Sequence, residues 1–249
     1  MIPTTIGLGR QFTNAIRDRA LPRSIGSLLM TEKSWLPFSH WNLRYNPFGE
    51  LTPSERAAVA VFDVRPIVQQ LAQKQTAVQF IGPCGRGKTT RLLALQRHLA
   101  IPSTATIYLP PLSWAVPRWW YKTLQVVGAP IIIDEAQRMP LPVRKMIFRR
   151  RVPLVLGTHR DLTGPLRRAG YQVFTYAVGP QNDARHVAAV ANARLSAARL
   201  TPAEVPQLSI EDAQRLVARF GDDLREIESF LYHQVQQQVG CNGQMRFVD

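Results

Sequence analysis

Apolar positions along the chain follow two patterns, and the change between them falls near residue 180. Before it, short runs of β-branched and other apolar residues alternate with segments of helical character; from 181 onwards only amphipathic helical segments follow. Apolar runs of strand length that alternate with helices are typical of a parallel sheet covered by helices on both faces. The pattern predicts an α/β fold: a five-stranded, mainly parallel sheet flanked by helices, followed by a C-terminal helical lid.

Strands are expected at 76–82, 104–109, 131–134, 152–157 and 172–178. Helices are expected at 89–100 and, in the lid, at about 181–199, 209–220 and 222–239. Another helix should start at Thr52, which can cap it. Pro53 suits the first helical position, and Glu55 completes a capping box with Thr52. Apolar positions at helical spacing then continue through Val64. The predicted organisation is an N-terminal extension (1–50), an α/β core (51–180), the lid (181–240) and a tail (241–249).

Composition narrows the class of protein. Hydrophobic residues make up 45% of the 249 positions, which excludes intrinsic disorder. No apolar run approaches the ~20 residues of a membrane span, and the charges scattered through 1–30 do not resemble a secretory signal. Cys84 and Cys241 cannot form a disulfide framework, and no Cys/His spacing suggests zinc. We therefore expect a cytoplasmic protein that does not enter membranes.

The formal net charge is +14, which indicates a polyanionic partner such as nucleic acid or, alternatively, only a basic proteome. More than half of this excess lies between 137 and 168, so the charge is clustered. After the third predicted strand, one stretch carries several cations and no acid: Arg144, Lys145, Arg149, Arg150 and Arg151. A helix there could present these cations as a stripe that contacts the phosphates of a nucleic acid without contacting its bases. Alternatively, the cations form only a solvated helix face.

A glycine-rich segment follows the first strand directly and precedes a helix. Its sequence, Gly82-Pro83-Cys84-Gly85-Arg86-Gly87-Lys88-Thr89, fits the pattern G-x-x-x-x-G-K-[ST]. Glycines allow the backbone N–H groups to curl around phosphate oxygens, and the helix N-terminus adds a positive dipole. Lys88 can reach the β- and γ-phosphates, Thr89 can ligate Mg²⁺, and Thr90 completes the nucleotide-binding segment. The alternative is a strand–helix turn with an incidental lysine.

Two adjacent carboxylates, Asp134 and Glu135, end the third strand. Asp134 suits a Mg²⁺ ligand, and Glu135 can orient or deprotonate an attacking water. The alternatives are a helix cap and a surface ion pair between Glu135 and Arg138. Adjacent residues on one strand face opposite ways, which argues against a glycosidase-type pair.

Other polar residues occur where they could complete such a site. Thr158, at the tip of the fourth strand, is the first candidate to sense a γ-phosphate, and His159 is the second. Arg167 or Arg168, before the fifth strand, could reach the γ-phosphate of a neighbouring subunit, or could belong to a solvated turn. Arg225 could fold back over the phosphates, or pair with Glu228 at i,i+3 on the helix surface.

The order of these motifs resembles that of the AAA+ ATPases, over residues 45–238. Asn46-Pro47-Phe48, Asp-Glu-Ala-Gln at 134–137 and Leu-Gly-Thr-x-Arg at 156–160 are similar to the branch of transposition helpers (the TniB/TnsC kind) and ExeA-like secretion ATPases. This resemblance implies ATP hydrolysis with Mg²⁺, a ring or filament of identical subunits, and an arginine supplied by a neighbour. Arg167 and Arg168 occupy that place, although Arg-Arg-Ala-Gly replaces the usual Arg-Phe pair.

An aromatic and basic interval, 112–122, lies between the second and third strands. Trp114, Trp119, Trp120 and Tyr121 interleave there with Arg118 and Lys122, a mixture that suits stacking on bases and contact with phosphates; alternatively, the tryptophans pack a helix on the sheet. The sequence thus predicts an ATPase that binds DNA without sequence preference and assembles on or remodels a protein partner. A slow NTPase switch that recruits proteins without DNA, and a P-loop kinase, are the alternatives.

Overall fold

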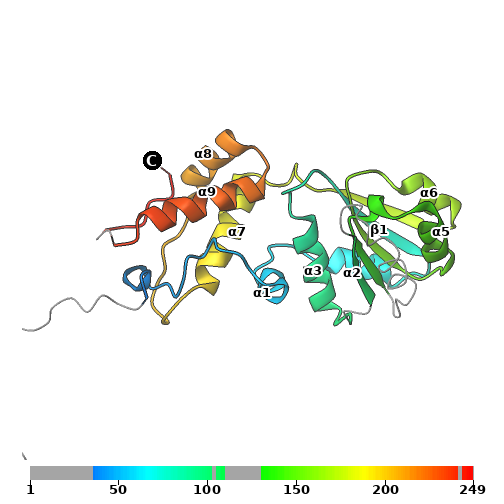
Figure 1. The fold of residues 1–249 in the computed structure, drawn as a ribbon, viewed down its shortest axis with the longest axis horizontal. Helices are drawn as coiled ribbons and strands as arrows, with labels where there is room; N and C mark the ends of the chain where they lie inside the picture. The colour runs from blue at the N-terminus through cyan, green and yellow to red at the C-terminus, as the bar shows by residue number, and fades with distance from the viewer. Residues whose placement is uncertain (1–35, 103–104, 110–129, 241–242, 249) are drawn as a thin grey trace, which may run out of the picture. The chain divides into compact units, whose positions relative to one another are not determined.

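The computed structural model describes residues 36–102, 105–109, 130–240 and 243–248, which belong to one compact unit that starts at Leu36. The centre of its α/β part is a five-stranded sheet with strand order β2-β3-β4-β1-β5 (Figure 1). The strands are β1 (Thr76–Ile81), β2 (Thr106–Tyr108), β3 (Ile131–Asp134), β4 (Leu154–Thr158) and β5 (Gln172–Ala177). All neighbouring pairs are parallel, so the predicted α/β class and parallel sheet are confirmed.

Parallel pairing brings the chemically interesting positions to one edge of the sheet. In the register, Ile81 at the end of β1 lies beside Thr158 at the end of β4, and Ile133 of β3 lies beside Leu156 of β4. The carboxyl ends of β1, β3 and β4 therefore meet. The glycine-rich segment, the Asp134–Glu135 pair and the Thr158–His159 tip all start from this edge.

Helices cover both faces of the sheet. On one face, α2 (Arg65–Leu71) and α3 (Lys88–His98) pack against residues such as Val78 and Phe80 of β1. On the other face, α5 (Leu141–Arg149) and α6 (Thr163–Arg168) pack against Ile131 and Leu154. The strands β1, β3 and β4 are buried along nearly their whole length, which explains their continuous apolar runs, whereas the edge strands β2 and β5 are partly exposed.

The C-terminal helices form a separate apolar core. These helices are α7 (Ala184–Ala197), α8 (Ile210–Phe220) and α9 (Leu224–Gln237), and each begins at a capping side chain: Asp183, Ser209 and Asp223. Their core also contains the aromatic side chains of an early segment, Phe38, Trp41 and Phe48, and that of Phe247 near the C-terminus. Residues 38–48, which include the 3₁₀ helix η1 (Ser39–Trp41), thus complete the helical core through contacts that are distant in sequence. In the described ranges, no helix is both long and apolar enough to cross a membrane.

The helix that starts at Thr52 is shorter than its apolar pattern predicts. The capping box of Thr52 and Glu55 is formed, but α1 (Pro53–Ala58) ends before Val64, and α2 follows as a second helix. Pro66 lies in the first turn of α2, where its missing N–H costs nothing, whereas it would interrupt the interior of one longer helix. The predicted continuation through Val64 was therefore wrong.

Candidate functional site

The glycine-rich segment connects β1 to α3 and bends sharply. Gly85 and Gly87 have φ values of 79° and 94°, in the left-handed region that favours glycine. The Lys88 ammonium lies against the start of the loop, where Nζ donates to the carbonyl oxygens of Gly82 at 2.8 Å and Pro83 at 2.6 Å. Burial lowers the pKa of Lys88, although the nearby Glu135 carboxylate counteracts this. The loop therefore holds a buried cation at its centre.

Two candidate metal ligands meet beside this loop. The Thr89 hydroxyl donates to Oδ2 of Asp134 at 2.6 Å, and Oδ1 of Asp134 accepts the N–H of Glu135 at 3.0 Å. Gly157 of β4 makes room for the carboxylate, because a Cβ at that position would lie 2.6 Å from Oδ1 of Asp134. Among the described residues, no group of three or more His, Cys, Asp or Glu side chains could hold a metal ion. Two hard oxygens fit Mg²⁺, which commonly takes one or two protein ligands and completes its shell with water and phosphate.

Glu135 has an unusual backbone conformation, and its carboxylate contacts three side chains. Its φ of 58° places a non-glycine residue in the left-handed region, a conformation that costs about 1–3 kcal/mol and is concentrated at functional sites. Oε2 accepts the amide of Gln137 at 2.7 Å and lies 3.2 Å from Arg138, and Oε1 lies 3.2 Å from Nε2 of His159. Burial raises the pKa of Glu135, but the contacts with Gln137, His159 and Arg138 outweigh it, so the pKa is lowered overall. The carboxylate is thus held ionised and oriented.

At the tip of β4, the two sensor candidates have different surroundings. Thr158 is fully buried, and its hydroxyl exchanges hydrogen bonds with the backbone O and N of Arg160 at 2.8 and 3.1 Å. His159 reaches Glu135, its backbone N–H donates to Oε1 of Gln137 at 3.1 Å, and its ring lies 3.7 Å from Sγ of Cys84 in the loop. The side chain that connects the tip of β4 with the loop and with Glu135 is that of His159.

The C-terminal helical region touches the glycine-rich loop through Arg86. This guanidinium pairs with Asp222 at 2.8 Å and with Asp223, the two acids that precede α9. A Cβ on Gly85 would lie 2.1 Å from Oδ1 of Asp223, so the loop glycine is needed for the close approach of this carboxylate. The ion pairs and the close packing fix the loop against the start of α9.

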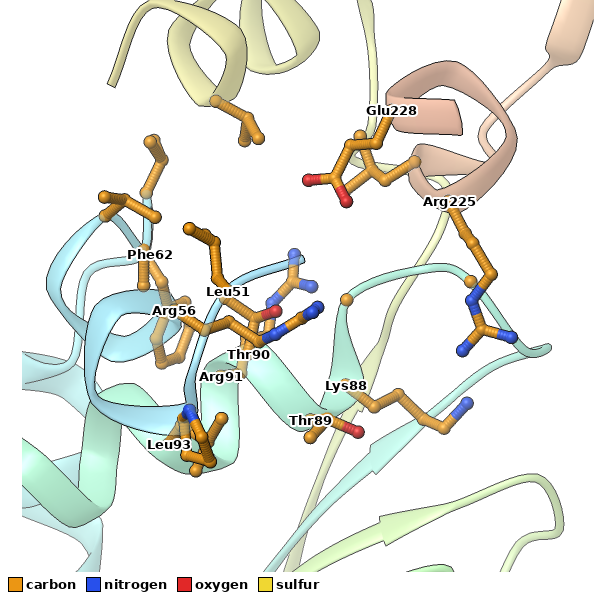
Figure 2. A pocket seen from close by; sticks show the side chains of 18 of the residues that line it. Leu51, Arg56, Phe62, Lys88, Thr89, Thr90, Arg91, Leu93, Arg225 and Glu228 are labelled. Atoms are coloured by element: carbon orange, nitrogen blue, oxygen red, sulfur yellow. The ribbon is translucent and has the colours of Figure 1, made fainter. Parts of the chain in front are cut away.

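A cavity of about 430 Å³ extends from Lys88 and Glu135 between α1, α3, α7 and α9. Cys84, Thr89, Thr90 and Arg225 also line it. Figure 2 shows Arg225 extending from the start of α9 towards Lys88, and the charge of Arg225 contributes to the lowered pKa of Lys88. The predicted alternative, an Arg225–Glu228 pair, is not formed: Glu228 pairs with Arg194 of α7 at 2.7 Å.

Arg167 and Arg168 lie at the opposite edge of the sheet from the loop. They occupy the last turn of α6, and β5 starts a few residues later at Gln172, whose N–H bonds to Gln75 just before β1. The glycine-rich loop lies beyond the other end of β1, about 20 Å away along the strands. Among the described residues, neither arginine forms an ion pair or hydrogen bond with the loop, and both side chains are exposed, although the charge of Arg167 helps to lower the pKa of Asp161, just after β4.

The basic helix α5 has one buried and one charged face. Val143, Ile147 and Phe148 pack into the core, and Lys145 and Arg149 are exposed at i,i+4 spacing. The remaining cations of the predicted stripe, Arg144, Arg150 and Arg151, lie on or just after α5; of these Arg151 is exposed. Arg118 and Lys122 of the aromatic interval lie outside the described residues.

Several contacts of the site carry no recognisable sequence signal. Gln137 connects Glu135 to His159 only because β3 and β4 are neighbours in the sheet. The contacts of Arg86 with Asp222 and Asp223 join segments far apart in the chain. Two further arginines of the cavity, Arg56 and Arg91, lie in helices whose pattern suggested nothing beyond packing or solvation.

Comparisons with known proteins leave the resemblance of the motifs as a prediction. No model of a known protein family matches this chain, and no curated protein sequence matches it. The fold and the contacts of the described residues are therefore the basis for any functional assignment.

Proposed function

We propose that the protein is a Mg²⁺-dependent ATPase of the AAA+ kind, with a P-loop at Gly82–Thr89 and a helical lid formed by α7–α9. The observation that carries the proposal is the contact of Thr89 with Asp134 at 2.6 Å, with Glu135 next along the chain and Lys88 at the centre of the adjacent loop. A cation, two hard oxygens and an oriented carboxylate at one sheet edge are the groups that nucleoside triphosphate hydrolysis requires.

Each residue has a role in this proposal. The backbone N–H groups of the loop and the Lys88 ammonium bind the phosphates, for which Lys88 leaves the carbonyl oxygens of Gly82 and Pro83. Thr89 and Asp134 would hold Mg²⁺, which would supply neutralisation of charge on the phosphate oxygens. Glu135 accepts a proton from the attacking water. Oε2 contacts Gln137 and Arg138, whereas Oε1 contacts only His159, so Oε1 keeps a lone pair for this proton.

The apolar part of the cavity suits a nucleoside. Val61 and Phe62, which follow α1, form one wall, and Val190 of α7 and Leu224 of α9 also line the cavity. The Arg225 guanidinium lies on the Lys88 side and can contact phosphates. The distance of Arg167 and Arg168 from their own loop supports a role in a neighbouring subunit, and hence a homo-oligomer.

A nucleic-acid role is proposed for the exposed face of α5. Lys145 and Arg149 follow one another along this face, and two exposed cations at this spacing can track a phosphate backbone without reading sequence. The energy of hydrolysis would then drive assembly on DNA or remodelling of a protein partner.

Steady-state ATP hydrolysis with Mg²⁺ tests the catalytic part. Glu135→Gln should abolish turnover and retain ATP binding, because the amide cannot accept a proton but fills the same space. Glu204→Gln, an exposed position distant from the loop, is the matched control and should retain wild-type turnover. Normal turnover in Glu135→Gln would refute the assignment, and phosphate transfer to an acceptor in place of water would indicate a kinase.

The same assay with double-stranded DNA, single-stranded DNA and RNA tests the second part. Nucleic acid should stimulate turnover. The double variant Lys145→Gln/Arg149→Gln should lose about two phosphate contacts and so reduce the slope of log K against log salt concentration by about two. Lys74→Gln/Arg185→Gln removes the same charge from exposed positions elsewhere and should change little. ATP hydrolysis without any salt-dependent binding would leave a nucleotide switch that acts on proteins alone.

A further inference from the structure

Two arginine side chains line the cavity beside the start of α3. Arg56 comes from α1 and Arg91 from α3, and Figure 2 shows both reaching into the same part of the cavity. Arg91 is only 6% exposed. Its contacts are the carbonyl oxygen of Arg86, 3.3 Å from Nη1, and the face of the Phe62 ring, whose centroid is 5.6 Å from Cζ. These contacts leave most of the guanidinium donors free to meet a ligand.

Among the residues that the structure describes, no carboxylate pairs with either of these two cations, Arg56 and Arg91. Glu228 lines the same cavity, but its Oε1 is held by Arg194 at 2.7 Å. His186 on α7 adds no negative charge, and burial and the charge of Arg91 both lower its pKa, so the ring stays neutral at neutral pH.

Such an arrangement is costly in the free protein. A buried charge without a partner loses its hydration and receives no Coulomb attraction in return, and burial accordingly lowers the pKa of Arg91. A neutral hydrogen-bond acceptor would satisfy some donors but would leave the charge. An anion removes both costs, and the planar guanidinium matches the oxygens of a phosphate.

We propose that Arg56 and Arg91 form a second anion-binding subsite, which takes a phosphate group other than the 5′-phosphate chain at Lys88. The identity of the first subsite rests on the proposed function. The second phosphate has two possible sources with the same chemistry. It is either carried on the ribose of the nucleotide itself, or it is a separate phosphate ion bound beside the nucleotide.

Calorimetric titration of the full chain distinguishes these sources. The probes for the first are AMP, ADP and the adenosine 2′,5′- and 3′,5′-bisphosphates, since ADP and the bisphosphates carry the same number of phosphates in different places. A phosphate on the ribose should tighten binding about tenfold relative to AMP, and Arg56→Gln or Arg91→Gln should abolish that gain with little effect on ADP. The probe for the second source is inorganic phosphate, titrated with and without saturating ADP.

Arg97→Gln is the matched control, because Arg97 lies on the same helix as Arg91 but is exposed and outside the cavity. Arg56→Gln keeps the test valid if Arg91→Gln does not fold, since Arg56 is only half-buried. The proposal is overturned if the variants leave binding of both the bisphosphates and inorganic phosphate unchanged. Failure of ADP to bind would instead count against the proposed ATPase, and the phosphate titration without ADP would still decide the subsite.

Discussion

Arg86 and Arg91 flank the start of α3, and the structure surrounds these two arginines differently. Arg86, in the glycine-rich loop, is paired with Asp222 and Asp223 in front of α9. Arg91, little more than one helical turn later, is more deeply buried than most arginines, and the described residues give it a carbonyl oxygen and an aromatic ring but no acid. Of two arginines that both contact the glycine-rich loop, one is thus neutralised by acids and the other is left charged.

The difference separates two uses of a cation near a binding site. A paired arginine joins two segments and fixes their geometry, but has little charge left for a ligand. A buried arginine without an acidic partner stabilises the fold little or destabilises it, because the free energy lost on removing its hydration is not regained from contacts within the protein. We infer that the part of the loop held by Asp222 and Asp223 is organised before a ligand binds, whereas the environment of Arg56 and Arg91 is completed by the ligand.

Gly157→Ala tests the organised side and should have the largest effect. The new Cβ would lie 2.6 Å from Oδ1 of Asp134 and 2.9 Å from Cδ1 of Leu92, so the carboxylate and the Leu92 side chain must both shift. We expect a loss of about 2 kcal/mol in the free energy of unfolding, measured by urea denaturation. Gly164→Ala in α6 is the control, because a Cβ there meets nothing closer than 3.8 Å and should leave stability equal or higher. Equal stability of the two variants would show that Asp134 is not tightly held.

Arg86→Met should have an intermediate effect. It keeps most of the side-chain volume but leaves Asp222 and Asp223 without their cation, beside a loop whose Gly85 approaches Asp223 closely. We expect a loss of about 1–2 kcal/mol, because the pairs are partly buried. Hydrogen exchange at the start of α9 should also become faster. Unchanged stability and exchange would mean that the ion pairs do not fix the loop against α9.

Arg91→Met is the direct counterpart and should cost less than Arg86→Met. The thioether keeps the contact with Phe62 and removes a buried charge that has no acid as partner. Stability without ligand should stay within about 1 kcal/mol of wild type, or rise, in the same urea experiment. A loss as large as that of Arg86→Met would show that Arg91 is already compensated within the protein, and would end the comparison.

Local signals in the sequence were sufficient for most of the fold. The run Ile131–Ile133 has the β-branched composition of a strand buried on both faces, and β3 is such a strand. The capping box at Thr52 is equally local and is also confirmed. The end of α1 at Ala58 was not predicted, because apolar spacing alone does not show that a second helix starts at Arg65, with Pro66 in its first turn.

Contacts between distant segments could not be predicted in this way. Glu228 has an arginine at i−3 with suitable spacing, yet it pairs with Arg194 of another helix, because the packing of α7 on α9 brings that buried guanidinium closer. The contact between His159 and Glu135 likewise depends on the strand order. Sequence therefore indicated the residue types at the candidate site, and the partner of each side chain required the tertiary structure.

The last and smallest effect concerns His186, which faces Arg91. Burial and the charge of Arg91 lower the pKa of His186 below its usual 6.5, and Asp183 raises it only in part. As the pH falls through about 6.5, the histidine of the unfolded chain takes up a proton, whereas that of the folded chain does so only at a lower pH. Between these two pKa values the unfolded state is favoured, so His186 lowers the free energy of unfolding as the pH falls. Above this range it has no effect. His186→Gln should remove this part of the pH dependence of unfolding, whereas His98→Gln, at an exposed position, should retain it.

Arg91→Met should weaken the same dependence, because it removes one of the two causes. If it does not, the charge of Arg91 is neutralised in the folded protein, and the contrast with Arg86 is smaller than the structure indicates.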